Sequence, residues 1–156
     1  MSYLADYALQ VAMQMEQLGQ TFYKSLSAGC GNAKIAALAG LLAREEENHF
    51  LTFEKMRNAI PAEERGPKMT EDQITAAAGK FYKLILPSPA DVRKVADSGN
   101  VANALDMAMQ MESDSIAYYS SLLSVVGRDG AILKAVIKEE EKHLAILHDY
   151  RKRITA

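Results

Sequence analysis

The sequence has very little of the residue that builds disulfides and thiolate metal sites. It contains a single cysteine, Cys30, among 156 residues, so no internal disulfide and no Cys-x-x-Cys pair can form. This excludes the common zinc and iron–sulfur centres that rely on such pairs. Cys30 stands between two glycines, where we expect a turn, and we assign it no role. A lone thiol fits a reducing compartment, so we expect a cytoplasmic location.

Long apolar runs and a strong charge of one sign are also missing. No apolar stretch reaches the roughly 18 residues that suggest a membrane span. The N-terminus lacks the basic head and the long apolar run of a secretory signal. The formal net charge of −2 gives no reason to expect a nucleic acid or an anionic membrane surface as partner. We therefore expect neither nucleic-acid nor membrane binding.

Tryptophan is absent, whereas alanine, leucine and methionine are plentiful, and this mix favours helix over sheet. A chain of 156 residues is long enough to bury a real core within one domain. We expect a single all-α domain over residues 1–156.

The pattern of caps and breaks predicts four long helices. Ser2 is a candidate N-cap for a first helix to about Leu26. Asn32 can cap a second helix that ends near Asn58. Two more long helices are expected over residues 101–126 and 130–154.

Short helices are expected between the two pairs, after an exposed loop at residues 61–69. Thr70 and Gln73 form a capping box for a helix to about Ile85. Ser88, followed by proline, can cap another short helix that stops near Gly99.

The two halves of the chain repeat each other. Residues 8–16 align with residues 104–112, and the offset is 112 − 16 = 96. The later helices match at an offset of 140 − 46 = 94. Each half is therefore predicted to be a helical hairpin, and two hairpins make an antiparallel four-helix bundle with pseudo-twofold symmetry. Hairpin one covers residues 2–59, the crossover 60–99 and hairpin two 100–154.

Polar residues that bind metals fall on the apolar faces of the predicted helices when each helix is drawn with about 100° per residue. Two Glu-x-x-His motifs and one glutamate on each remaining long helix share this property: Glu16, Glu46, His49, Glu112, Glu140 and His143. Gly19 is small and leaves room beside the first of these. Glu45, Glu47 and Asn48 fall off the face, and we expect them to be solvated.

Four buried carboxylates in one layer would repel each other and take up protons unless cations joined them. Two divalent metals would neutralise this charge, and Glu-x-x-His places both ligands on one helix face. Carboxylate with imidazole suits iron or manganese. The six positions fit the arrangement of ferritin-like dimetal bundles, with Glu46 and Glu112, or their counterparts, bridging the ions. A metal-free helical scaffold is the alternative.

Tyr23 and Tyr119 lie seven residues after Glu16 and Glu112, on the same faces. They are candidate catalytic residues that hydrogen-bond the ligand carboxylates or donate an electron or a proton. The alternative is an ordinary buried tyrosine with any available partner. The methionines are expected to pack in the core, and His148 to lie on the surface.

At these residues the sequence resembles the rubrerythrin-like branch of the ferritin-like superfamily. The motif Glu-x6-Tyr followed by Glu-x-x-His occurs twice, as Glu16, Tyr23, Glu46 and His49 and again as Glu112, Tyr119, Glu140 and His143. The resemblance implies a non-haem di-iron centre that reacts with hydrogen peroxide or dioxygen in a detoxifying role. Manganese or zinc can replace iron in such a centre. A homodimer is also implied.

Two departures from the family are visible. The family usually carries a rubredoxin domain with Cys-x-x-Cys pairs, so here a separate rubredoxin-like protein is the expected electron donor. The family also has an extra ligand glutamate one turn past the third-helix glutamate, where this sequence has Ser115. Two alternatives to a peroxide or oxygen reductase therefore stay open: a ferroxidase of the ferritin type that handles iron, and a di-iron hydroxylase of an organic substrate.

Overall fold

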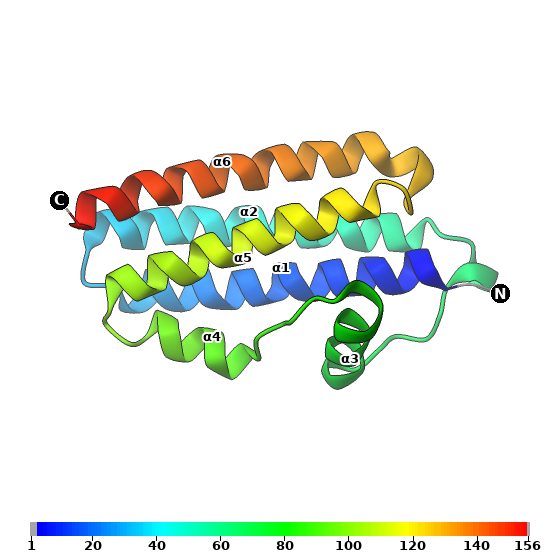
Figure 1. Cartoon of the computed structure of the whole chain (residues 1–156), viewed down its shortest axis with the longest axis horizontal. Helices are drawn as coiled ribbons and strands as arrows, with labels where there is room; N and C mark the ends of the chain where they lie inside the picture. The colour runs from blue at the N-terminus through cyan, green and yellow to red at the C-terminus, as the bar shows by residue number, and fades with distance from the viewer. Residues whose placement is uncertain (1–2, 156) are drawn as a thin grey trace.

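Four long helices lie side by side along the long axis of the molecule (Figure 1). The computed structural model describes residues 3–155, and over that range it contains helices and turns without strands. The four helices are α1 (Leu4–Gly29), α2 (Ala33–Asn58), α5 (Val101–Leu122) and α6 (Gly130–Thr155). Helix α1 packs along α2, and α5 packs along α6. The predicted all-α bundle of two helical hairpins is confirmed.

Capping contacts confirm most of the predicted helix starts. The side chain of Asn32 accepts hydrogen bonds from two backbone N–H groups at the start of α2. Thr70 and Gln73 form the expected capping box, and Ser88 caps the next short helix. Ser2, the expected cap of the first helix, lies outside the described residues.

The C-terminal ends of three helices differ from the prediction. Helix α3 (Glu71–Tyr82) stops before Ile85 because Lys83 adopts a left-handed backbone conformation with φ of 52°. Helix α5 stops at Leu122 rather than Val126. Near this end, the hydroxyls of Ser121 and Ser124 donate to backbone carbonyls three residues back, which gives the backbone an alternative to continued helix. Helix α1 runs about one turn longer than expected.

The crossover runs along the outside of the bundle. It includes the 3₁₀ turn η1 (Ala62–Glu64), helix α3 and helix α4 (Pro89–Ala96), and both helices pack against α1 (Figure 1). A second 3₁₀ turn, η2 (Gly127–Asp129), joins α5 to α6. The crossover therefore shields α1 and leaves α6 on the far side of the bundle.

Asp6 ties the crossover to the bundle from a completely buried position. Its carboxylate lies 2.6 Å from Arg57 Nε and accepts hydrogen bonds from the side chain of Gln10 and the backbone N–H of Gly66. A Cβ at Gly66 would lie 2.5 Å from the ring of Tyr7, so the loop can approach this closely only with glycine there. The sequence suggested that the loop at residues 61–69 is exposed. In the structure part of this loop packs against α1 instead.

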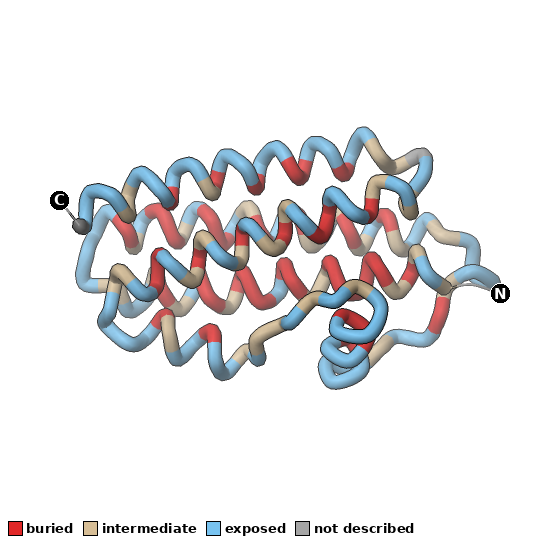
Figure 2. Tube along the Cα trace, in the orientation of Figure 1, coloured by how far each residue is buried: buried red, intermediate tan, exposed pale blue. Residues whose placement is uncertain are grey.

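The apolar core is divided into two clusters by a polar layer. Figure 2 shows the buried positions facing inward along the four long helices. One cluster lies toward the start of α1 and includes Leu9, Phe53, Tyr119 and Leu133. The other lies toward the end of α1 and includes Phe22, Leu42, Leu105 and Leu147. The residues between the clusters are the candidate metal ligands, so apolar packing closes the layer at both ends.

Among the described residues, no helix combines the length and the apolar content needed to cross a membrane.

Candidate metal centre

The polar layer brings together the six residues that the sequence identified as candidate ligands. Each hairpin supplies three of them, and each residue is at most 3% exposed: Glu16, Glu46, His49, Glu112, Glu140 and His143. Their common height follows from antiparallel packing of helices that carry these residues near their middles. Two histidines from different hairpins face each other with ring centroids 6.0 Å apart.

The ligand atoms of these residues form two overlapping groups of four. Within each group, the atoms lie within 4.8 Å of one another. The carboxylates of Glu46 and Glu140 belong to both groups. The remaining glutamate and histidine of hairpin one complete the first group, and those of hairpin two complete the second. We expected Glu46 and Glu112, or their counterparts, in the shared position, and the geometry selects the glutamates of the two Glu-x-x-His motifs.

Seven buried atoms of this layer have no hydrogen-bond partner. They are Glu16 Oε2, Glu46 Oε1, Glu112 Oε2, both carboxylate oxygens of Glu140, and Nδ1 of His49 and of His143. His49 Nδ1 lies 2.5 Å from Glu140 Oε1, yet neither atom has hydrogen-bond geometry. Unpaired buried polar atoms are rare and unfavourable. Atoms that converge without bonding each other are arranged as ligands of a common cation, so the donor set fits two metal ions.

Burial makes these carboxylates hard to ionise together. It raises the pKa of Glu16 to about 7 and raises the pKa values of Glu46 and Glu140 well above the ordinary value. The negative charges of neighbouring carboxylates raise these pKa values further. Without cations the layer must therefore hold protons, and divalent metals would replace them.

Glu112 and His143 are the charged pair of the layer. Burial raises the pKa of Glu112, but the close approach of Glu140 and His143 and the hydrogen bond from Tyr23 outweigh burial and lower it. Burial lowers the pKa of His143, whereas its contacts with Glu112 and Glu46 raise it to about 10. In the metal-free protein, a protonated histidine beside an ionised carboxylate thus supplies part of the positive charge that a metal cation would supply.

The two tyrosines donate hydrogen bonds to carboxylates of the opposite hairpin. Tyr23 donates to Glu112 Oε1 at 2.7 Å, and Tyr119 donates to Glu16 Oε1 at 2.6 Å. Burial, followed by the nearby carboxylates, raises the pKa of both hydroxyls well above the ordinary value of 10. Both remain neutral donors at physiological pH and hold one oxygen of each glutamate in place.

Two further glutamates, which the sequence pattern did not single out, contact the histidines. Glu139 Oε2 lies 2.6 Å from His49 Nε2, and Glu45 Oε2 contacts His143 Nε2. Glu45 was expected to be solvated, but it is only partly exposed and points across to the other hairpin.

The repeat carried a signal for these contacts. Glu45 and Glu139 each stand immediately before the glutamate of a Glu-x-x-His motif, at an offset of 139 − 45 = 94. A carboxylate only accepts hydrogen bonds when ionised, so the Nε2–H of each histidine donates outward. This fixes Nδ1 toward the centre as the nitrogen available to a metal.

Gly19 gives the carboxylate of Glu46 its space. A Cβ at this position would lie 3.0 Å from Glu46 Oε2 and 3.3 Å from its Cγ. The sequence suggested that Gly19 leaves room beside Glu16 on its own helix. In the structure, Glu46 of the neighbouring helix α2 also lies against Gly19.

The other residues considered as candidates from the sequence lie away from the polar layer or pack beside it. His148 is exposed, as expected. Met107, Met109 and Met111 pack against the second apolar cluster. Cys30 is partly buried at the break after α1.

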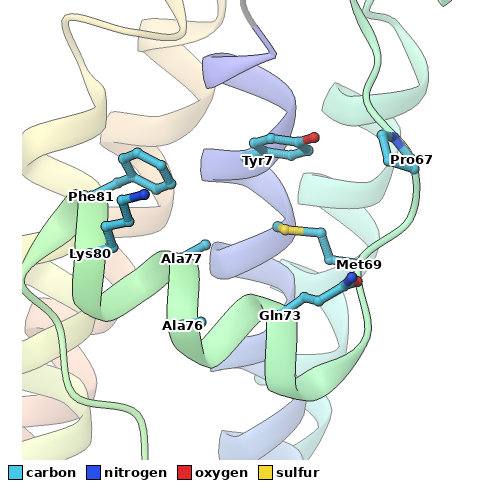
Figure 3. Close-up of a pocket in the computed structure, with 8 residues that line it drawn as sticks. All are labelled: Tyr7, Pro67, Met69, Gln73, Ala76, Ala77, Lys80 and Phe81. Carbon is cyan, nitrogen blue, oxygen red and sulfur yellow. The ribbon is translucent and has the colours of Figure 1, made fainter.

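A groove that is separate from the polar layer lies between α1 and α3 (Figure 3). It has a volume of about 310 Å³ and is lined mainly by apolar side chains, including Tyr7, Met69 and Phe81. None of the six candidate ligands lines it. Its chemistry therefore does not add to the candidate centre.

Comparison with protein families agrees with the geometry of this layer. The rubrerythrin family model matches residues 8–150, which include all six candidate ligands and both tyrosines. Comparisons with curated proteins and with solved structures gave no significant match. The match spans most of the chain. The chain therefore belongs to the rubrerythrin family, a ferritin-like di-iron family.

Proposed function

We propose that this protein is a non-haem di-iron oxidoreductase that reduces hydrogen peroxide or dioxygen with electrons from a separate donor. The observation that carries the proposal is the pair of overlapping four-residue groups, buried and holding seven unpaired ligand atoms. Carboxylates with one imidazole per ion suit iron. Manganese or zinc would also bind such a set, so the identity of the metal is part of the proposal.

Each residue of the layer has a role in this proposal. Glu46 and Glu140 would serve both ions because they belong to both groups, and one histidine would serve each ion. Tyr23 and Tyr119 orient the terminal carboxylates through their hydrogen bonds. When bound, two ferrous ions supply the two electrons that convert hydrogen peroxide and two protons into two water molecules.

The apolar clusters above and below the layer keep bulk water from the bound oxidant. They also keep the carboxylates in a medium where each interaction with a cation is strong. As the pH rises, the buried carboxylates lose their protons, and metal ions are then favoured as their partners.

An external electron donor is proposed because the one cysteine of the chain cannot build a rubredoxin-type iron site. A small rubredoxin-like protein is the proposed donor. We also propose a homodimer of single-domain subunits that works in the cytoplasm against oxidative stress.

The test is peroxide consumption by iron-loaded protein with reduced rubredoxin. We expect turnover that requires both components and that is lost in Glu46→Ala. Metal content is measured in parallel, since loss of activity must accompany loss of iron. Iron-loaded protein that leaves peroxide unchanged while reduced rubredoxin stays reduced would contradict the proposal.

The second candidate is a ferroxidase that handles iron without turning over another substrate. The observation in its favour is the symmetry of the set, because each hairpin gives two glutamates and one histidine. Assembly into a cage and oxidation of many ferrous ions per chain would support it. A dimer with peroxidase activity would support the first.

A further inference from the structure

A small cavity lies beside the shared carboxylates on the side of the bundle formed by α1 and α5. Met15 and Gly19 line it from α1, and Met111 and Ser115 line it from α5. The carboxylates of Glu46 and Glu112 form its inner wall. Neither histidine lines it, so this cavity reaches the layer from the side away from the imidazoles.

The cavity follows the internal repeat. Met15 and Met111 are equivalent residues at an offset of 111 − 15 = 96, and Gly19 and Ser115 are equivalent at 115 − 19 = 96. The same two positions of each hairpin therefore contribute to the cavity, together with Tyr23, Glu46 and Glu112. The small residues stand one turn past a ligand glutamate in each helix and leave space that a larger side chain would fill.

Glu46, Glu112 and Ser115 line the cavity, and each has a side-chain oxygen without a hydrogen-bond partner in the described part of the protein. Glu46 Oε1 and Glu112 Oε2 are buried without hydrogen bonds. Ser115 is 8% exposed. The structure gives its hydroxyl no hydrogen-bond partner among the described residues. A hydroxyl in the lining of this cavity that donates to nothing in the protein is available to a ligand there.

The size of the cavity limits what can bind. Its volume is about 10 Å³, close to the smallest space that holds one water molecule. The two methionine side chains are flexible and can yield enough for a molecule of two heavy atoms. An organic substrate has no room here, which weighs against a hydroxylase.

We propose that this cavity is the binding position of the oxidant, and that Ser115 donates a hydrogen bond to it. The ligand class is a neutral molecule of two oxygen atoms, hydrogen peroxide or dioxygen. Met15 and Met111 line this position from the two helices. This inference rests on the proposed function, because the oxidant must reach the metals bound by Glu46 and Glu112.

The probe is nitric oxide, a molecule of two heavy atoms that binds ferrous iron. Its association rate with the diferrous protein is measured by absorbance in wild type, Ser115→Val and Ser115→Ala. Ser115→Val removes the hydroxyl and fills the cavity, whereas Ser115→Ala removes the hydroxyl alone. Ser113→Val is the matched control, since Ser113 is exposed on the same helix. Thermal melting and iron content are recorded for each protein.

We expect Ser115→Val to bind two irons normally and to slow nitric oxide association by about tenfold or more, equivalent to about 1.4 kcal/mol. Ser115→Ala should keep fast association and, because the lost bond is to substrate, show a raised KM for peroxide. Ser113→Val should behave as wild type. Fast association in a folded, iron-loaded Ser115→Val variant would overturn the proposal.

Failure of the proposed function gives a different result. If wild type binds iron and nitric oxide, and Ser115→Val slows association, the proposed binding position is supported even when peroxide is not consumed. If wild type binds no metal, both proposals are overturned together. If Ser115→Val misfolds, the KM of Ser115→Ala for peroxide tests the proposal. An unchanged KM in that variant contradicts hydrogen bonding by Ser115.

Discussion

His49 of hairpin one and Glu139 of hairpin two meet at 2.6 Å between Nε2 and Oε2, at the outer edge of the polar layer. His49 is 3% exposed and Glu139 is 52% exposed. The contact therefore joins a buried ring to a carboxylate at the surface. Its counterpart between His143 and Glu45 gives each histidine an outward partner from the opposite hairpin.

Replacing Glu139 tests whether this contact orients the ring. In Glu139→Ala, His49 loses the acceptor that holds Nδ1 toward the centre, and we expect metal affinity to fall about 10- to 100-fold. Glu139→Gln retains an acceptor and should recover part of the loss. Metal titration of the metal-free protein measures both. Glu141→Ala is the control, because Glu141 is exposed on the same helix, and equal affinities in Glu139→Ala and Glu141→Ala would contradict the role.

The fold and the six buried candidates could be predicted because the repeat and the helical period act locally. Positions of one kind recur at an offset of 96 or 94, and a glutamate on an apolar helix face must find a partner. Glu45 and Glu139 could not be placed in the same way. Each is off the apolar face of its own helix, and its contact depends on how the two hairpins dock.

The packing of the two hairpins also determines which carboxylates belong to both ligand groups. A helical wheel turns Glu46, Glu112 and Glu140 inward alike, but it holds no information on distances between helices. The end of α5 was missed because serine side chains compete for the backbone carbonyls there. The end of α3 was missed because the left-handed residue is Lys83 rather than a glycine.

Gly19→Ala tests how tightly the layer is packed. The added Cβ would stand 3.0 Å from Glu46 Oε2, so the shared carboxylate must shift by a few tenths of an ångström. We expect weaker metal binding with little loss of helix, since alanine favours helix over glycine by about 1 kcal/mol. The readout is the metal dissociation constant alongside the thermal midpoint. Gly79→Ala in α3 meets nothing within 4 Å and should raise stability without changing metal affinity.

Tyr119→Phe tests the hydrogen bond to Glu16. The variant leaves another oxygen of a buried carboxylate unpaired, so metal-free protein should lose about 1–3 kcal/mol of stability in denaturant unfolding. Metal affinity should fall as well, because Glu16 loses its anchor. Tyr118→Phe removes a hydrogen bond of 2.8 Å to the carbonyl of Ala8 and touches no candidate ligand. A fall in metal affinity of the same size in Tyr118→Phe would show that the effect is general to the core.

The metal-free protein should lose stability as pH rises. Burial raises the folded-state pKa of Glu16 to about 7, above its ordinary value of 4.5, so the folded protein binds more protons than the unfolded chain between these values. By linkage, that stabilisation is complete below about pH 4.5 and is lost as pH rises through about 7. The raised pKa values of Glu46, Glu140 and His143 act in the same direction, whereas the lowered pKa of Glu112 favours folding above its ordinary value.

Thermal midpoints across pH 5 to 8, with and without metal, measure this dependence. Metal-loaded protein should not show the decline, because cations replace the protons. A midpoint that rises with pH in metal-free protein would contradict the assignment of buried, proton-holding carboxylates.

The most direct test of the account is the metal content of protein purified without chelator. We predict two iron or other divalent ions per chain, and loss of both in the double variant Glu46→Ala with Glu140→Ala, since these are the shared carboxylates. Glu47→Ala with Glu141→Ala, at exposed neighbouring positions, should retain them. Fewer than about one metal per chain, unchanged by removing Glu46 and Glu140, would contradict the presence of a dimetal centre in this bundle.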